Sequence, residues 1–313
     1  MPKEFLYLVQ SSAARLPLNL HLANRPSSDA VFLTFDAPAE GALFMERCTW
    51  GEGRNRLAER AREKPGYSYY IFIDDDVVFA KGGFDRFEEL LRRRRPAFAC
   101  PVFIPKNRFT VLGIGGGLLR PPFRCLQVQL VRLGDGQMVA LHSTVLADGL
   151  LFPLQTRFDP QSWWCTSSTL QTLAVNLYGR HALQLNPVAV RNEEHRDYVR
   201  QTGFSEQTAW LTRQFRRPIY QPEPYAVNLL SLDGLKRLVK RLRNPLPHKH
   251  RLFTEWVRTL VGSLLYKPRD SYAFTPDSLA RLLNPDSDLY RQYLRISPHG
   301  RRASIGRSGM SGD

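Results

Sequence analysis

The first hundred residues alternate between apolar runs and amphipathic segments. Four runs are short and almost unbroken in hydrophobicity, as strands buried on both faces are: Phe5 to Val9, Ala30 to Phe35, Tyr69 to Ile73 and Ala97 to Ile104. Two segments, Arg54 to Lys64 and Phe84 to Arg95, place apolar side chains on one face at helical spacing. This alternation predicts an α/β fold with a mostly parallel sheet covered by helices.

The pattern changes in the middle of the chain. Gln127 to Arg132 and Gln137 to His142 alternate like the two strands of one hairpin. A helix is predicted over Ser168 to Tyr178, followed by two short strands, Ala182 to Leu185 and Val188 to Val190. The second half therefore adds shorter strands to the first.

The last third is predicted to be helical and basic. Leu232 to Leu242 and Leu252 to Leu265 each carry an apolar stripe with lysines and arginines opposite it, and Thr275 to Leu283 begins with a capping Thr275 and Pro276. The stripes either pack on the sheet or bind an anionic membrane surface. The residues after Ser297 are rich in Gly, Ser and Arg, which predicts disorder.

Charge and cysteine usage narrow the function classes. The 313 residues carry a formal net charge of +15, which favours polyanionic or phosphorylated partners. No nucleic-acid-binding module is recognisable, so no specific nucleic acid partner is expected. The four cysteines form no CxxC pair, which argues against a zinc ribbon and favours a reduced, cytoplasmic location. No apolar run reaches the roughly 18 residues of a membrane span.

Polar residues stand where the predicted strands end. Gln10 and Ser11 follow the first strand, Asp36 the second, and Asp74-Asp75-Asp76 the third. Ligands of open α/β sheets bind at the carboxyl ends of strands. Three adjacent carboxylates repel one another, and a Mg²⁺ or Mn²⁺ ion would offset that repulsion and bind a diphosphate.

These residues carry a resemblance to a known family. The stretch Trp50-Gly-Glu-Gly-Arg54-Asn55-Arg56-Leu57-Ala58, followed by Tyr69 to Asp76, resembles the GT-A glycosyltransferases, in particular bacterial family 2-like members that use nucleotide sugars. In that family an Arg-Asn helix start precedes a strand that ends in a DxD motif. The resemblance implies a GT-A-like, Rossmann-type mixed sheet flanked by helices, with a helical C-terminal appendage.

The resemblance implies boundaries for these parts. Residues 1–228 would form the catalytic domain, with nucleotide-binding residues 1–105 and acceptor-binding residues 106–228. Residues 229–297 would be the basic helical region, and 298–313 a disordered tail.

The resemblance also implies the metal ligands. Asp76 would bind the metal and Asp74 would lie nearer the ribose, with Asp75 beside them on the nucleotide sugar. The segment Asn192 to Tyr198 resembles the N-x-x-H-x-x-Y ending of some members, which makes His195 a third ligand. A surface histidine in a charged segment is the alternative for His195.

The nucleotide would contact residues from three elements. Gln10, Ser11 and Asp36 are where such enzymes hold the base and ribose, and Arg54 and Asn55 would brace the nucleotide or the aspartate loop. For Asn55, a helix start satisfied by local hydrogen bonds is the alternative.

The acceptor side is less well defined. Asp148 and Asp159 are the candidate bases for a glycosyl transfer. Trp163 and Trp164 are candidates for stacking on an acceptor sugar, although such pairs also occur in protein cores. Many family members have an acidic pair near this point, whereas this chain has Cys165-Thr166-Ser167-Ser168.

The predicted activity is therefore transfer of a sugar from a nucleotide-sugar donor to a glycan or lipid-linked glycan acceptor, with Mn²⁺ or Mg²⁺. A cytoplasmic enzyme, either free or on the inner face of the membrane, fits that role in glycan assembly. Two alternatives stay open: a metal-dependent nucleotidyltransferase or nuclease, and a non-catalytic protein that binds nucleotide sugars or glycans.

Overall fold

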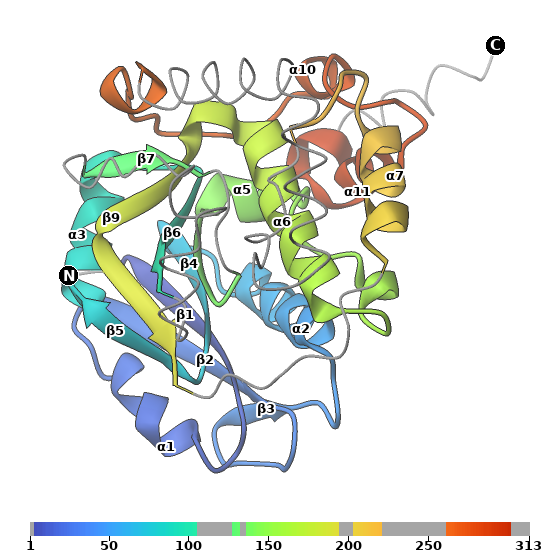
Figure 1. Ribbon diagram of the computed structural model, residues 1–313. Coiled ribbons are helices and arrows are strands. Elements are labelled where there is room, and N and C mark those ends of the chain that lie inside the picture. The colour runs from blue at the N-terminus through green and yellow to red at the C-terminus, as the bar shows by residue number, and fades with distance from the viewer. Residues whose placement is uncertain (1–2, 105–126, 132–135, 194–202, 221–260, 302–313) are drawn as a thin grey trace, which may run out of the picture.

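The computed structural model describes residues 3–104, 127–131, 136–193, 203–220 and 261–301. Within these residues nine strands form one sheet in the order β3-β2-β1-β4-β8-β6-β9-β5, with β7 paired to β9 (Figure 1). The strands are β1 Phe5–Ser11, β2 Ser28–Thr34, β3 Ala42–Phe44, β4 Tyr69–Asp74, β5 Val77–Lys81, β6 Phe98–Phe103, β7 Val128–Leu130, β8 Met138–His142 and β9 Ala182–Asn192.

Helices flank this sheet on both faces, which confirms the predicted α/β fold with a mixed sheet (Figure 1). The α-helices are α1 Leu16–Asn19, α2 Trp50–Arg62, α3 Phe84–Arg94, α5 Ser143–Asp148, α6 Trp163–Tyr178, α7 Phe204–Gln214, α10 Pro276–Ala280 and α11 Asp288–Ile296. The short 3-10 helices are η1 Leu20–Leu22, η2 Thr156–Phe158 and η3 Gly179–His181.

Each face of the sheet has its own hydrophobic cluster, and β1 shows why. Successive side chains of a strand point to opposite faces. Leu6 and Leu8 therefore join the cluster that contains residues of α2, α5 and α6, whereas Phe5, Tyr7 and Val9 join the cluster that contains residues of α1 and α3. The unbroken apolar run is thus the mark of a strand covered on both sides.

Parallel pairing brings the predicted polar strand ends to one edge. β1 lies between β2 and β4 and runs parallel to both, and Gln10 is in register with Asp74. Asp75, which follows β4, therefore lies beside Ser11 at the end of β1 and Ser12 just after it.

The sheet is less parallel than the sequence predicts. Four ladders are parallel, β1–β2, β1–β4, β2–β3 and β6–β9, and four are antiparallel, β4–β8, β5–β9, β6–β8 and β7–β9. The predicted hairpin is wrong: β7 pairs with β9, while β8 inserts between β4 and β6. The two predicted strands after residue 181 are one strand, β9, with an irregularity in its pairing to β6.

The C-terminal residues pack into the sheet domain. Leu279, Leu283 and Tyr293 belong to the cluster that covers the α2 face. Thr275 caps α10 as predicted, although α10 ends at Ala280. The predicted boundary at residue 228, the stripe Leu232 to Leu242, and residues 302–313 of the predicted tail lie outside the described residues, whereas residues 298–301 form a helical turn.

Three of the four cysteines, and the search for a membrane-spanning helix, fall within the described residues. Cys48, Cys100 and Cys165 are free thiols in buried positions, whereas Cys125 lies outside the described part of the chain. Over the residues that the structure describes, no helix is both long and apolar enough to cross a membrane.

Candidate nucleotide-sugar site

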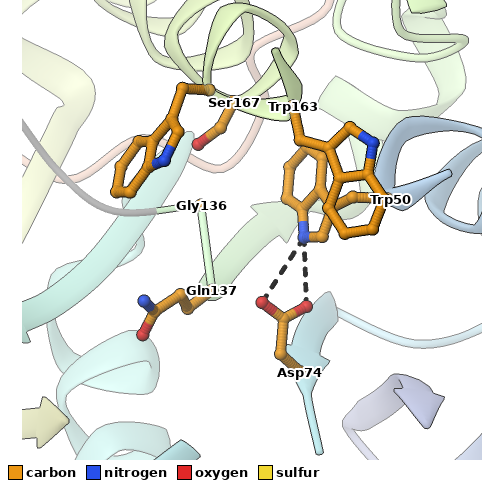
Figure 2. A pocket seen from close by; sticks show the side chains of 7 residues that line it. Trp50, Asp74, Gly136, Gln137, Trp163 and Ser167 are labelled. Atoms are coloured by element: carbon orange, nitrogen blue, oxygen red, sulfur yellow. Dashed lines mark hydrogen bonds between the residues drawn. The ribbon is translucent and has the colours of Figure 1, made fainter. Parts of the chain in front are cut away.

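Asp74, the last residue of β4, is held by two side chains of α2. The Arg54 guanidinium donates to Asp74 Oδ1 at 2.5 Å. The Trp50 indole N–H donates to Oδ1 at 3.1 Å and Oδ2 at 3.4 Å (Figure 2). Trp50 and Arg54 are four residues apart, so they lie on the same helix face. Burial raises the pKa of the Asp74 carboxyl, and the Arg54 charge opposes that rise.

Arg54 is the central cation of this arrangement. Its side chain is fully buried, donates to the carbonyls of Gly136 and Gln137, and lies over the Trp50 ring at 5.0 Å. Buried charges require partners of this kind. Arg54 thus contacts the first aspartate of the triplet, while its predicted role toward a nucleotide stays a prediction.

Asp75 is bound by the loop that follows β1. Its Oδ2 accepts from the Ser12 backbone N–H at 2.9 Å and from the Ser11 hydroxyl at 3.1 Å. Arg15 Nε lies 3.8 Å from the same oxygen, and Arg15 also reaches Glu193 at 3.8 Å. Asp75 thus joins the ends of β1 and β4.

Asp76 is partly buried beside two other carboxylates. Burial, followed by repulsion from Asp74 and Asp75, raises its pKa to about 7, while Arg15 opposes the rise. Its backbone carbonyl accepts from the Glu193 N–H, which ties the triplet to the end of β9. A bound cation would favour the ionised form of a carboxyl whose pKa is raised in this way.

The carboxylates and this pKa shift fit a divalent cation with oxygen ligands. Among the described residues, however, no group of three or more His, Cys, Asp or Glu side chains is arranged to hold a metal. His195, the predicted third ligand, lies outside the described residues. The metal set therefore stays a prediction built on Asp76 and Asp74.

Gln10 and Asp36 lie beside the triplet at the same sheet edge. The Gln10 amide donates to the Thr49 carbonyl at 3.3 Å, and Gly53 approaches so closely that a Cβ there would come within 2.5 Å of that amide. Asp36 is exposed, and its Oδ1 accepts from the backbone N–H groups of Ala13 and Ala37. Both residues are thus placed at the expected edge.

A pocket opens over Asp74. It encloses about 350 Å³ including its mouth, and it is lined by Trp50, Asp74, Gly136, Gln137, Trp163, Trp164 and Ser167 (Figure 2). Trp163 is 41% exposed, so part of its side chain faces solvent. The structure brings the predicted acceptor tryptophans to the same pocket as the first aspartate of the triplet.

The two predicted bases lie elsewhere. Asp159 is buried and accepts from the hydroxyls of Thr49, which caps α2, and Thr166 of α6. Asp148 is buried and accepts from the Phe274 N–H at 2.7 Å and the Ser297 hydroxyl at 3.1 Å.

Burial raises the pKa of Asp159, and it raises the pKa of Asp148 to about 6. In these positions Asp159 joins two helices, and Asp148 holds the C-terminal segment. Their role as bases remains a prediction that these contacts do not support.

Asn55 also points away from the triplet. Its amide N–H donates to the Leu154 carbonyl at 3.1 Å, and its Oδ1 accepts from the Leu154 N–H at 2.5 Å. This pair of bonds fixes the segment after the cis peptide Phe152-Pro153 against α2. Asn55 thus lies inside α2 and makes long-range bonds to Leu154, so the alternative of a helix start satisfied by local bonds does not describe it, and its predicted nucleotide contact stays a prediction.

Sequence reasoning missed four pocket residues: Trp50, Gly136, Gln137 and Ser167. Trp50 stands four residues before Arg54, a spacing that was available as a signal. Gly136 gave no such signal, because only the structure shows that a Cβ there would lie 2.5 Å from Ser167 Oγ and 3.0 Å from the Trp50 ring. Ser167 reaches the pocket only because α6 begins at Trp163, five residues before the predicted start.

Comparisons with known proteins give structural similarity alone. No family model matches the sequence, and no curated protein matches it. The fold is similar to S. aureus TarS 1–349, at 11% identity and a TM-score of 0.43, over 60% of this chain and 60% of that one.

The TarS structure in complex with UDP-GlcNAc gives the same identity and TM-score, over 66% and 64% of the two chains. Glucosyl-3-phosphoglycerate synthase from Mycobacterium tuberculosis, solved with Mg²⁺ and UDP, is 12% identical, with a TM-score of 0.37 over 68% and 76%. The chain thus spans under two thirds of the TarS length.

Proposed function

We propose that this protein is a glycosyltransferase that moves a sugar from a nucleotide-sugar donor to a glycan or lipid-linked glycan acceptor. One observation carries the proposal: three aspartates end a buried strand, and separate partners bind the first two. Arg54 and Trp50 bind Asp74, and the loop after β1 binds Asp75. Asp76 keeps a pKa of about 7, which suits a ligand for Mg²⁺ or Mn²⁺.

The proposed donor site follows the sheet edge. The base and ribose would lie along Gln10, Ser11 and Asp36, at the ends of β1 and β2, where α/β sheets bind nucleotides. Asp76 and Asp74 would hold the cation, with His195 as a further ligand. When bound, the cation neutralises the charge of the departing nucleoside diphosphate.

The proposed acceptor site is the tryptophan-lined pocket. Indole faces pack on the apolar faces of sugar rings, while Gln137 and Ser167 offer hydrogen bonds to hydroxyls. The pocket includes Asp74, so a sugar bound there would be next to the donor site. This adjacency is what a transfer reaction requires.

A second candidate is a non-catalytic protein that binds the same ligands. The observation that favours it is the engagement of both predicted bases, Asp148 by Phe274 and Ser297, and Asp159 by two threonine hydroxyls. A carboxylate in such bonds is less available to take a proton from an acceptor hydroxyl.

A calorimetric titration tests the donor site. UDP and GDP are titrated into the wild-type protein with Mn²⁺ or with EDTA, beside Asp76→Asn and the exposed control Asp286→Asn. Cation-dependent binding that is lost only in Asp76→Asn is expected. If neither UDP nor GDP binds in the presence of Mn²⁺, the proposal is wrong.

A donor panel separates the two candidates. Nucleotide sugars are ranked by thermal shift with Mn²⁺, because a ligand of the folded state raises its stability. The best donor is then incubated with the protein and an acceptor panel, and release of free nucleotide is measured. Release identifies the enzyme, whereas tight binding without release over the whole panel identifies the non-catalytic candidate.

A further inference from the structure

A helical turn near the C-terminal end exposes three large apolar side chains. Val261, Leu264 and Leu265 are 45%, 62% and 65% exposed. They lie on the turn 261–265, which Figure 1 draws in orange beside β7. These residues end the apolar stripe that the sequence shows from Leu252 to Leu265, and the structure leaves its end uncovered.

This turn is fixed to the sheet by its inward-facing residues. Gly262 packs on Leu130 of β7, where a Cβ would come within 2.8 Å of the leucine side chain. The Tyr266 hydroxyl donates to the carbonyl of Arg94 at 2.8 Å, and its ring lies 5.5 Å from that of His181. The three apolar side chains therefore project from an anchored element.

Exposed cations lie close to the exposed apolar residues in sequence and beside their anchor. Lys267 and Arg269 follow them directly and are exposed, and Arg180 is an exposed neighbour of His181, whose ring packs on Tyr266. Burial, together with the charges of Arg269 and Arg180, lowers the pKa of His181 to about 4. The nearby Asp270 is paired with Arg95.

We propose that this surface docks on an anionic lipid bilayer. It is called the basic apolar patch below and consists of Val261, Leu264, Leu265, Lys267, Arg269 and Arg180. Apolar tips enter the boundary between headgroups and acyl chains, while flanking cations bind anionic headgroups.

The patch lies at the opposite end of β9 from the aspartates. Leu183, near the start of β9, pairs with Leu130, on which the turn packs, whereas Asn192 at the other end pairs with Val77, next to Asp76. Docking through the patch would therefore leave the aspartate edge of the sheet uncovered. The inference does not depend on which reaction that edge performs.

Vesicle co-sedimentation tests the inference on the full chain. Phosphatidylcholine vesicles are compared with vesicles that also contain phosphatidylglycerol, at low and high NaCl. The expected result is binding to the anionic vesicles only, decreasing with salt because ions screen the attraction. Leu264→Ser with Leu265→Ser should reduce the bound fraction about tenfold.

A matched pair of leucines serves as the control. Leu18 and Leu20 are 65% and 44% exposed at α1 and η1, and Leu18→Ser with Leu20→Ser should leave vesicle binding unchanged. Circular dichroism confirms that both double variants are folded.

The inference is overturned by absence of binding to anionic vesicles, or by equal binding of the Leu264 and Leu265 double variant. Sedimentation velocity adds a third refuting outcome. If this double variant changes only self-association, the patch is an interface between copies of the chain.

Discussion

Replacing Asp76 with asparagine should stabilise the protein in the absence of metal, and the size of the effect follows from its pKa. The pKa is about 7 in the folded protein, against an ordinary value of 3.8. Each pKa unit corresponds to about 1.4 kcal/mol, so ionised Asp76 would cost the fold about 4 kcal/mol without solvent screening. Asp76 is partly exposed, which reduces the expected cost to about 2 kcal/mol.

The sign of the pH dependence is fixed by the direction of the shift. The folded protein holds the Asp76 proton to higher pH than the unfolded chain does. The cost is therefore absent below the ordinary pKa, grows between about pH 4 and pH 7, and is constant above that range. Asparagine does not ionise, so Asp76→Asn gains the most above pH 7.

Urea unfolding in EDTA at pH 4 and pH 8 measures this difference, provided that the m-value is unchanged. Adding Mn²⁺ at pH 8 should stabilise the wild-type protein and not Asp76→Asn. Asp75→Asn is the matched control and should destabilise, because Asp75 accepts bonds from Ser11 and Ser12. The reasoning is refuted if Asp76→Asn is less stable than wild type at pH 8 in EDTA, or if its advantage is equal at both pH values.

Three further substitutions probe the contacts around the site. Arg54→Met leaves Asp74 buried without its cation and should cost about 3–5 kcal/mol in urea unfolding; a cost below about 1 kcal/mol would contradict the buried pair. Asn55→Ala should cost about 1–3 kcal/mol through the lost Leu154 bonds, and calorimetry should show unchanged nucleotide affinity. Trp163→Ala should change the free energy of unfolding by less than about 1 kcal/mol, because the side chain is 41% exposed. The same substitution should weaken glycan binding measured by fluorescence. Unchanged binding would show that Trp163 is not part of the acceptor site.

The parts of the fold that were predictable from sequence are those fixed by local patterns. The run Tyr69 to Ile73 is apolar at every position, and the structure buries it on both faces as β4. The predicted helix over Arg54 to Lys64 is α2, although α2 begins earlier, at Trp50, because Thr49 and Glu52 form a capping box. Since β1, β2 and β4 are parallel neighbours, their polar ends meet at one edge, as the sequence predicts.

The parts that were not predictable depend on long-range pairing. Val128 to Leu130 and Met138 to His142 alternate as hairpin strands do, but residue alternation does not identify the partner of a strand. Val139 packs opposite Phe72 of β4, and that pairing is decided by burial on both faces of the sheet. The contacts of Asp159 have the same origin: it is predicted to be a base from its tryptophan neighbours, whereas one of its two hydrogen-bond partners, Thr49, is far away in sequence.

The insertion of β8 between β4 and β6 determines which pocket residues can change without displacing the aspartates. β8 begins beside Asp74, whose backbone N–H donates to the Gln137 carbonyl at 2.9 Å, so the residues that enter β8 form the pocket wall. The aspartates themselves belong to the β4 side of this pairing. Substitutions at Gly136 and Gln137 can therefore reshape this wall while the acidic cluster and its guanidinium brace keep their positions. Selectivity could then change at the pocket wall without rebuilding the sheet.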